Sequence, residues 1–469
     1  MLDRDLAFLP AWKLGALIVG KEISPVELTE LYLQRIDTFD NKLNSYLSVT
    51  SDLALSQART SEARIMRGAR IRPLEGIPIS IKDLMFVKNE VTTSGSLIFR
   101  NYVPKQDSVS VERIKRSGAI ILGKTNTPEF GLAGTTHNRL GDECRNPWDI
   151  ERTSGGSSGG GAAALAAGLC SLALGSDGGG SIRIPASFCG IFGIKPSRGR
   201  VARYGGVGGW PLFSTIGPMT RSVQDSAMLL QVISGHDSRD VTSLRRRSNF
   251  LRPLKKSLDG SRIAWSPNLG YAAVDSGVAN VTKKAVDALT ELGICVDEPN
   301  VAMEDPFQHF WNIGTVDSYA ALGSLYKEHN SKLTEYAREF IGNGRTVAAV
   351  EYARSFHSLL NLQAYMESIF AKYDILITPV AAVPPFKVGQ GPSVISGKNV
   401  SPAWGFFPFT YPFNMTGHPA ASVPCGFSAD GLPIGLQIIG RSEDESTVLR
   451  VCAAFEEILP WSAKRPTVS

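Results

Sequence analysis

The feature that most constrains this chain is a glycine-rich stretch, residues 154–196, that contains two well-separated serines. It reads SGGSSGGGAAALAAGLCSLALGSDGGGSIRIPASFCGIFGIKP and places Ser157 and Ser181 24 residues apart, each among glycines. An Ala/Leu-rich run between them is long enough for one helix and one short strand. Glycine loses more chain entropy on folding than any other residue, so these runs are costly to order. They suit a site where backbone N–H groups approach a reacting atom, which points to acyl chemistry at a serine.

Size and charge describe an ordinary globular protein. The chain has 469 residues, of which 43% are hydrophobic and 20% charged, so a large core is expected. A net charge of +5 is mild for this length and does not indicate a nucleic-acid partner. The most basic stretch, residues 245–256, is interpreted as a solvated connector.

Strand and helix patterns alternate along most of the chain. Ser24-Pro-Val-Glu27 has the form of a helical capping box with proline at the first helical position. Further helices are predicted at residues 53–66, 108–116, 162–167, 278–292 and 445–459, and strands at residues 77–81, 119–122, 172–174, 261–265, 295–298, 374–378, 421–424 and 435–439. This alternation predicts an α/β protein with a twisted mixed β-sheet covered by helices on both faces. One domain spanning residues 1–469 is expected, with N-terminal helices, about residues 1–70, packed on it.

Cysteine and histidine usage argues against a metal centre. The six cysteines show no CxxC spacing and the six histidines no HExxH motif, so neither a metal nor a cofactor is expected. Most cysteines lie among apolar neighbours, which favours a reducing compartment. The N-terminus lacks a signal-peptide pattern and no run approaches the ~20 apolar residues that span a bilayer. We therefore expect a cytoplasmic protein without a membrane segment.

Two generic motifs in the chain are interpreted as coincidental. Residues 118–125 match the phosphate-binding string GxxxxGK[ST], but the four middle residues Ala-Ile-Ile-Leu favour a buried strand over a phosphate loop. Residues 155–159 match the GxSxG nucleophile elbow, which would make Ser157 the nucleophile and need a histidine such as His418. The elbow should directly follow a strand, and residues 145–153 do not read as one.

A third pattern, at residues 176–185, is more informative. Three successive glycines, Gly178, Gly179 and Gly180, precede Ser181 and can turn several N–H groups toward one point, which makes an oxyanion hole. Lys82 ends a strand-like run, GIPISIK. Taken alone it is either a snorkelling or Asp83-paired lysine, or a buried lysine whose lowered pKa lets it accept a proton.

Together these pieces resemble the amidase signature family. The match is carried by Lys82 in GIPISIKD, Ser157 in GGSSGGG and Ser181 in SDGGGSIRIP, with support from GAIILGKTNTPEFG, RNPWD, GPMTRSVQDSA, LITPV and FNMTGHPAASVPCGFSADGLPIGLQIIG. It covers most of the chain and is weakest over about residues 235–370, a variable region. The resemblance implies the amidase signature fold.

The resemblance also implies a Ser–cis-Ser–Lys triad. Ser181 would be the nucleophile, Ser157 would follow a cis peptide bond and bridge to Lys82, and neutral Lys82 would accept the proton. Amides around residues 178–181 would hold the oxyanion, while Asp177 and Arg183 would act as outer supports or as a simple ion pair. The family uses no histidine base, so His418 is expected in a loop or pocket wall.

The substrate is less well defined by the sequence. Six aromatic residues within WGFFPFTYPF, residues 404–413, are either core or the wall of a pocket for an aryl or bulky apolar amide, with Trp210 and Phe213 as additions. Esters or carbamates are further candidates. The alternatives are the glutamine-hydrolysing component of a tRNA-dependent amidotransferase, a Ser-His-Asp hydrolase using Ser157, a catalytically silent binding protein and a phosphate-binding protein. A homodimer is retained as an option.

Overall fold

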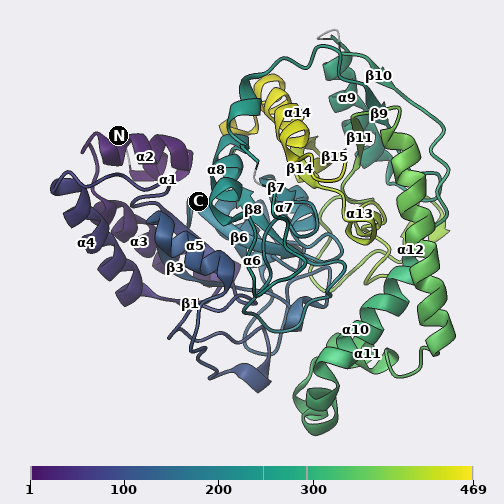
Figure 1. Cartoon of the computed structure of the whole chain (residues 1–469), viewed down its shortest axis with the longest axis horizontal. Helices are drawn as coiled ribbons and strands as arrows, with labels where there is room; N and C mark the ends of the chain where they lie inside the picture. The colour runs from purple at the N-terminus through teal and green to yellow at the C-terminus, as the bar shows by residue number, and fades with distance from the viewer. Residues whose placement is uncertain (1–2, 247, 292–293, 467, 469) are drawn as a thin grey trace.

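An eleven-stranded mixed sheet runs through the centre of the molecule (Figure 1). The computed structural model describes residues 3–246, 248–291, 294–466 and 468, and the sheet is counted within that part of the chain. In spatial order its strands are β1 (Tyr46–Val49), β3 (Ile120–Thr125), β2 (Pro78–Lys82), β6 (Leu172–Asp177), β8 (Thr215–Thr220), β7 (Phe192–Lys195), β14 (Ala420–Phe427), β15 (Pro433–Gly440), β11 (Ile375–Pro379), β9 (Ile263–Trp265) and β10 (Val296–Asp297). The trio β3, β2 and β6 is parallel, as is the trio β11, β9 and β10, and the other neighbours are antiparallel.

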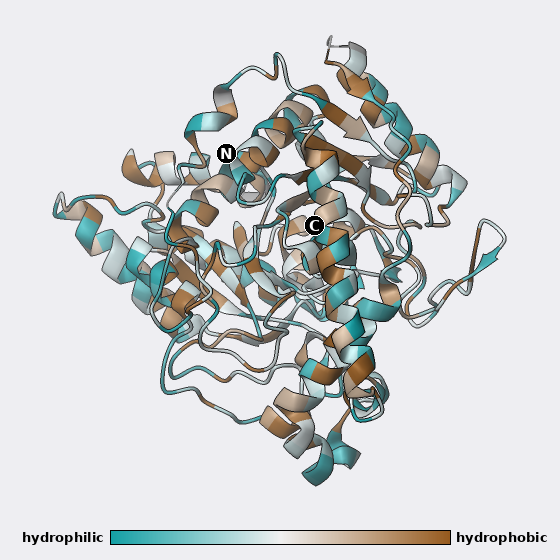
Figure 2. Cartoon of the chain, turned by 45° about the vertical axis from the view of Figure 1, so that its right-hand side comes forward, coloured by the Kyte–Doolittle hydropathy of each residue, from teal (hydrophilic) through white to brown (hydrophobic). Residues whose placement is uncertain are grey.

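Helices flank this sheet and confirm the predicted α/β class. They are α1 (Asp3–Phe8), α2 (Ala11–Val19), α3 (Pro25–Leu43), α4 (Ser51–Met66), α5 (Val109–Ser117), α6 (Gly159–Ala166), α7 (Arg183–Cys189), α8 (Val223–Ile233), α9 (Ser276–Glu291), α10 (Phe307–Glu328), α11 (Glu335–Asn343), α12 (Ala349–Phe370), α13 (Tyr411–Thr416) and α14 (Glu445–Ile458). The N-terminal helices gather at the β1 end, whereas α10 to α12, from the variable region, form an extension on the other side (Figure 1). Figure 2 shows hydrophobic strands inside and helices with hydrophilic residues outward.

The start of α3 shows how local sequence sets an element boundary. The Ser24 hydroxyl accepts hydrogen bonds from the amides of Val26 and Glu27, and the Glu27 carboxylate accepts from the Ser24 amide. The predicted capping box is therefore confirmed. Each such cap satisfies amide groups that the first helical turn leaves without partners.

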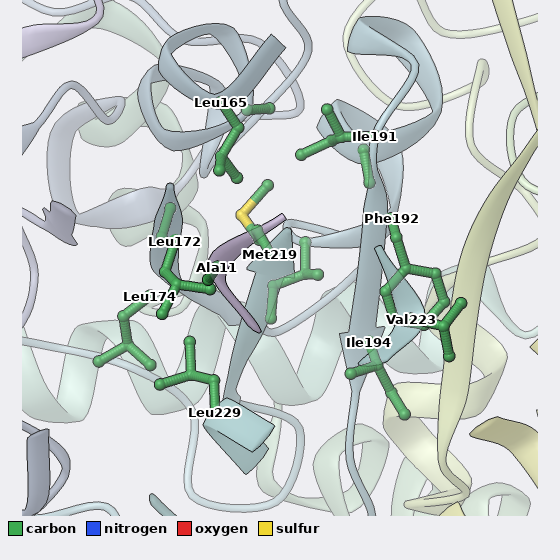
Figure 3. Packing of buried hydrophobic residues seen from close by; sticks show 14 of the residues in the cluster. Ala11, Leu165, Leu172, Leu174, Ile191, Phe192, Ile194, Met219, Val223 and Leu229 are labelled. Carbon is green, nitrogen blue, oxygen red and sulfur yellow. The ribbon is translucent and has the colours of Figure 1, made fainter. Parts of the chain in front are cut away.

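The core beside the serine-containing segments is closely packed. Leu165 of α6 and Leu229 of α8 pack around Met219 of β8, together with Leu172 and Leu174 of β6 (Figure 3). All five side chains are at most 1% exposed. Burying a leucine-sized side chain contributes about 1.5–3 kcal/mol, so this cluster fixes β6 and α6 relative to the sheet.

Two sequence interpretations are settled by the fold. Residues 120–125 form the buried strand β3, which confirms that the phosphate-binding string is not a loop. The prediction that residues 145–153 contain no strand is wrong, because β4 (Arg145–Asn146) and β5 (Asp149–Thr153) form an antiparallel hairpin. Most residues of β5 are at least partly exposed, so it lacks the hydrophobic run that marks a buried strand. This hairpin lies outside the central sheet, unlike the strand that a nucleophile elbow requires.

Candidate active site

Lys82 lies at the end of β2 and is fully buried. Its Nζ lies 2.7 Å from Oγ of Ser157 and 2.9 Å from Oγ of Ser158. The carbonyl oxygen of Ser176 is a third neighbour at 3.4 Å. No carboxylate contacts this amine among the described residues, so its hydrogen-bond partners are all neutral.

Burial determines the protonation behaviour of Lys82. Removal from water disfavours the ammonium form and lowers the pKa from 10.5 to about 7, against a weaker opposing attraction to Asp177. A lysine with a pKa near 7 holds a substantial neutral fraction at neutral pH. The amine is therefore able to exchange a proton with a neighbouring hydroxyl.

Ser157 and Ser181 line one cavity of about 160 Å³. The Gly156–Ser157 peptide bond is cis, as the resemblance implies. Ser181 sits in the turn between β6 and α7, and the Ser158 amide donates to the Ser181 carbonyl oxygen at 3.0 Å. This backbone bond holds the two serine segments side by side. A hydroxyl linked to Lys82 thus faces the same space as Ser181.

The three glycines before Ser181 differ in their hydrogen bonding. The Gly180 amide donates to Oδ1 of Asp177 at 2.7 Å, so this N–H is occupied by a carboxylate. Gly178 and Gly179 line the cavity, and within the described residues their amides have no hydrogen-bond partner. The expectation that all three glycines offer free donors is corrected at Gly180.

A buried ion pair supports this turn. Arg183 donates to both carboxylate oxygens of Asp177 at 2.9 Å, and both side chains are fully buried. Burial alone would raise the pKa of the Asp177 carboxyl, but the charge and hydrogen bonds of Arg183, with a further hydrogen bond from Asn414, hold it well below its usual range. The pair contacts β6, α7 and α13 and does not line the cavity. It acts by positioning the turn.

The aromatic residues of the 404–413 segment divide between pocket and core. Trp404 and Phe407 line the cavity, and the other aromatic residues of its wall are Phe130, Tyr204, Trp210 and Phe310 of α10. The other aromatic residues, Phe406, Phe409, Tyr411, Phe413 and Phe213, are buried in the core and do not line it. Phe213 stacks behind Phe310 with ring centroids 5.5 Å apart. The wall is therefore aromatic, but only in part from the predicted segment.

His418 is remote from the cavity. It is buried, stacks on Phe370 with centroids 4.9 Å apart, and its Nδ1 lies 2.8 Å from Oγ1 of Thr416. Burial lowers the pKa of its imidazole to about 3, and it does not line the cavity. The structure therefore gives Ser157 no histidine base at this position.

Three site features escaped the sequence interpretation. The hydroxyl of Ser158 and the carbonyl of Ser176 hold Lys82, and Phe310 comes from the variable region. The adjacent Ser157-Ser158 pair was a readable signal, since consecutive residues can reach one partner. The Ser176 carbonyl and Phe310 of the distant helix α10 have no comparable signal in the sequence.

The described residues contain no helix long and apolar enough to cross a membrane. They also contain no group of three or more His, Cys, Asp or Glu side chains arranged to hold a metal ion. The six cysteines are free thiols, and five are buried.

Comparison with known proteins agrees with the fold and the motif positions. A family model described as Amidase matches residues 27–449. An acylamidase of Rhodococcus erythropolis is 34% identical, covering 100% of this chain and 99% of its own. One component of the glutamyl-tRNA(Gln) amidotransferase of Moorella thermoacetica is 36% identical, covering 98% and 99%.

Structural similarity points the same way. The crystal structure of a bacterial aryl acylamidase of the amidase signature family superposes with a TM-score of 0.91 at 30% identity, covering 97% of each chain. The aligned relatives extend through the sheet, the glycine-rich turn and the C-terminal strands. The chain therefore belongs to the amidase signature family and is an amidohydrolase that acts on carbon–nitrogen bonds.

Proposed function

We propose that this enzyme hydrolyses amides with an aryl or bulky apolar group, through an acyl-enzyme on Ser181 and a proton relay of Ser157 and Lys82. The observation that carries this proposal is the environment of Lys82. Its amine is buried, its contacts are neutral, and it reaches the cavity through the Ser157 hydroxyl. These are the conditions for an uncharged lysine base.

The hydrogen-bond geometry suits a neutral amine. A neutral lysine has two N–H donors and one lone pair, whereas an ammonium has three donors and no acceptor. In the neutral form, Ser158 Oγ and the Ser176 carbonyl accept the two N–H groups, which turns the lone pair toward Ser157 Oγ at 2.7 Å. Ser157 is then the donor to Lys82, which is the direction that the proposed proton transfer requires.

The attack step follows from this arrangement. Ser181 Oγ forms a bond to the amide carbonyl carbon as its proton passes to Ser157 Oγ, whose own proton passes to Lys82 Nζ. The carbonyl oxygen becomes an oxyanion beside the free amides of Gly178 and Gly179. One such donor is worth about 3–4 kcal/mol in the transition state.

Collapse of the tetrahedral intermediate breaks the C–N bond. The proton on Lys82 returns through Ser157 to the departing nitrogen, because an amine leaves poorly unless it is protonated. Water then attacks the Ser181 ester by the same relay and releases the acid. Esters and carbamates contain the same electrophilic carbon, and we include them in the proposed substrate range.

The cavity wall supports an apolar substrate. Six aromatic side chains line it, and aromatic rings offer large contact areas to an aryl group. The acylamidase and aryl acylamidase relatives act on acyl amides by their names. A simple 4-nitroanilide such as 4-nitroacetanilide is the first substrate to test.

The second candidate is glutamine hydrolysis, favoured by the relatedness to a glutamyl-tRNA(Gln) amidotransferase component. Free glutamine carries an ammonium group, which needs a carboxylate in a desolvated pocket. No Asp or Glu lines the cavity among the described residues. Ammonia release from glutamine, measured without and with the other components of an amidotransferase, separates the two functions.

Covalent labelling tests the proposal. A fluorophosphonate should add to Ser181, located by peptide mass spectrometry, and Ser181→Ala should lower 4-nitroacetanilide hydrolysis at least ~10⁴-fold. A Ser187→Ala variant, which changes a buried serine that does not line the cavity, serves as the matched control. Label on Ser157, with activity retained in Ser181→Ala, contradicts the assigned roles.

A further inference from the structure

The cavity contains one charged side chain among the residues that line it in the described chain, Arg203. Every other lining residue is apolar, aromatic, glycine or a small hydroxyl residue. A cation in such a wall is costly to desolvate unless an anion accompanies it. Its presence therefore raises the question of which anion it meets.

No carboxylate of the described residues forms an ion pair with Arg203, although Asp240 attracts the guanidinium electrostatically. One terminal nitrogen, Nη1, donates to the carbonyls of Trp210 and Pro211 at 3.0 and 3.4 Å. The nearest acid, Asp240, accepts from the backbone amide of Arg203 at 2.7 Å and forms no ion pair with the guanidinium. Within the described residues, Nε and Nη2 donate to no atom. Nη1 therefore holds the loop, whereas Nε and Nη2 are available to bind a ligand.

The contacts of Ser214 relate the free Nη2 of Arg203 to the glycine turn that precedes Ser181. Nη2 lies 2.6 Å from the position of a Cβ on Gly209, and the Ser214 hydroxyl lies 3.7 Å from the same point. That hydroxyl is 3.0 Å from the position of a Cβ on Gly178, an expected oxyanion donor. The Ser214 hydroxyl therefore neighbours both Gly209 and Gly178, with the Trp210 ring also beside Gly178, and a side chain at Gly209 would collide with Nη2.

We propose that Arg203 is a specificity-determining residue that binds a carboxylate of the substrate, so that the preferred substrates are aryl or apolar amides that also carry a carboxylate a few atoms from the scissile bond. This inference rests on the proposed amide hydrolysis and narrows its substrate class. The planar guanidinium offers Nε and Nη2 as adjacent donors, which match the two oxygens of a carboxylate. The carboxylate of the substrate can belong either to its acyl group or to its amine group.

Matched substrate pairs on the wild-type enzyme test the proposal without a mutation. Succinyl and butanoyl 4-nitroanilide differ only at the end of the acyl group, which is a carboxylate in the first and a methyl in the second. N-Acetyl-4-aminobenzoate and 4-methylacetanilide make the same comparison on the amine side. We expect kcat/KM to be at least ~10-fold higher for the charged member of one pair, since hydrogen bonds to charged groups are worth about that factor or more.

Variants then assign the preference to Arg203. Arg203→Gln should lower kcat/KM for the preferred charged substrate ~10- to 100-fold and change its neutral partner less than ~3-fold, with partial rescue in Arg203→Lys. Arg239→Gln is the matched control, because Arg239 stacks on neighbouring Tyr204 while its charge is paired with Glu112 and Asp237. This control should keep the wild-type preference.

The outcomes distinguish this inference from the proposed function. Hydrolysis of neutral anilides without any preference for a carboxylate overturns the inference alone. Equal loss on charged and neutral substrates in Arg203→Gln also overturns it, since that pattern reports only the contacts with Trp210 and Pro211. An enzyme that cleaves none of the four amides overturns the proposed function and this inference with it.

Discussion

Two fully buried lysines on neighbouring strands have opposite surroundings. Lys124 of β3 lies 2.7 Å from the Asp83 carboxylate and also donates to Thr92, whereas Lys82 of β2 contacts only Ser157, Ser158 and a backbone carbonyl. Burial lowers the pKa of both amines, but a carboxylate opposes that shift directly at Lys124. The comparison sets a buried lysine paired as a structural cation against one that we propose accepts a proton.

Burial alone does not make a lysine catalytic. Lys195 of β7 is also fully buried, and burial lowers its pKa to about 7. Its Nζ donates to the carbonyl oxygen of Pro196, and it does not line the cavity. What singles out Lys82 is the combination of a low pKa with a hydroxyl that leads to the reacting groups.

The largest effect should follow from removing the Lys82 amine. Lys82→Met should lower kcat/KM for 4-nitroacetanilide about 10³- to 10⁴-fold, because the base and the acid of both half-reactions are lost. Circular dichroism and thermal melting should show a folded protein. A Lys82→Met variant with activity within tenfold of wild type would contradict the proposed role of Lys82 as the base.

Replacement of Lys124 should lower the free energy of unfolding and leave catalysis unchanged. Lys124→Met leaves the Asp83 carboxylate buried without its cation, which costs about 3–5 kcal/mol of unfolding free energy. Denaturant unfolding measures this loss, and kcat per folded molecule should stay near the wild-type value.

Lys115→Met provides the matched control for that change. The Lys115–Asp107 pair has the same 2.7 Å separation but is partly exposed, so its loss should cost at most about 1 kcal/mol. Equal losses in the two variants would show that burial does not distinguish these pairs.

The pH profile should report the neutral fraction of Lys82. Since the reaction needs the uncharged amine, kcat/KM should fall tenfold per pH unit below a pKa of about 7, reaching roughly 100-fold below the plateau at pH 5. Lys124→Met should retain the same midpoint. A flat profile with a rate-limiting chemical step would contradict a neutral-lysine base.

The smallest effect should come from His418. His418→Ala should change kcat per folded molecule less than ~3-fold, because the imidazole packs on Phe370 away from the cavity. Anilide hydrolysis, normalised to active sites by fluorophosphonate titration, measures it. A loss of several hundredfold would return the Ser157–histidine mechanism to consideration.

Sequence patterns predicted those parts that local chemistry determines. The capping box at Ser24 and the strand at residues 120–125 follow from hydrogen-bonding and hydrophobic preferences within a few residues. The hairpin at residues 145–153 was missed because its exposed residues carry no hydrophobic signal. The resemblance to the amidase signature family predicted Lys82, Ser157 and Ser181 as one group, and in the structure Ser157 lies beside Lys82 and shares a cavity with Ser181.

Long-range arrangement accounts for the rest. Phe310 and Arg203 line the cavity from α10 and from a glycine-rich loop, so nothing near them in the sequence indicates a pocket. The free amides at Gly178 and Gly179 and the occupied one at Gly180 differ through a single contact with Asp177.

The most direct measurement is the titration of the Lys82 amine itself. NMR of the Ser181→Ala variant with lysine labelled at the ε-carbon, assigned by the signal missing in Ser181→Ala/Lys82→Met, follows this group without turnover. An apparent pKa near 7 is expected for an amine surrounded by neutral partners. An amine that stays protonated to pH 9 or above would contradict the account, because Ser157 would then have no base.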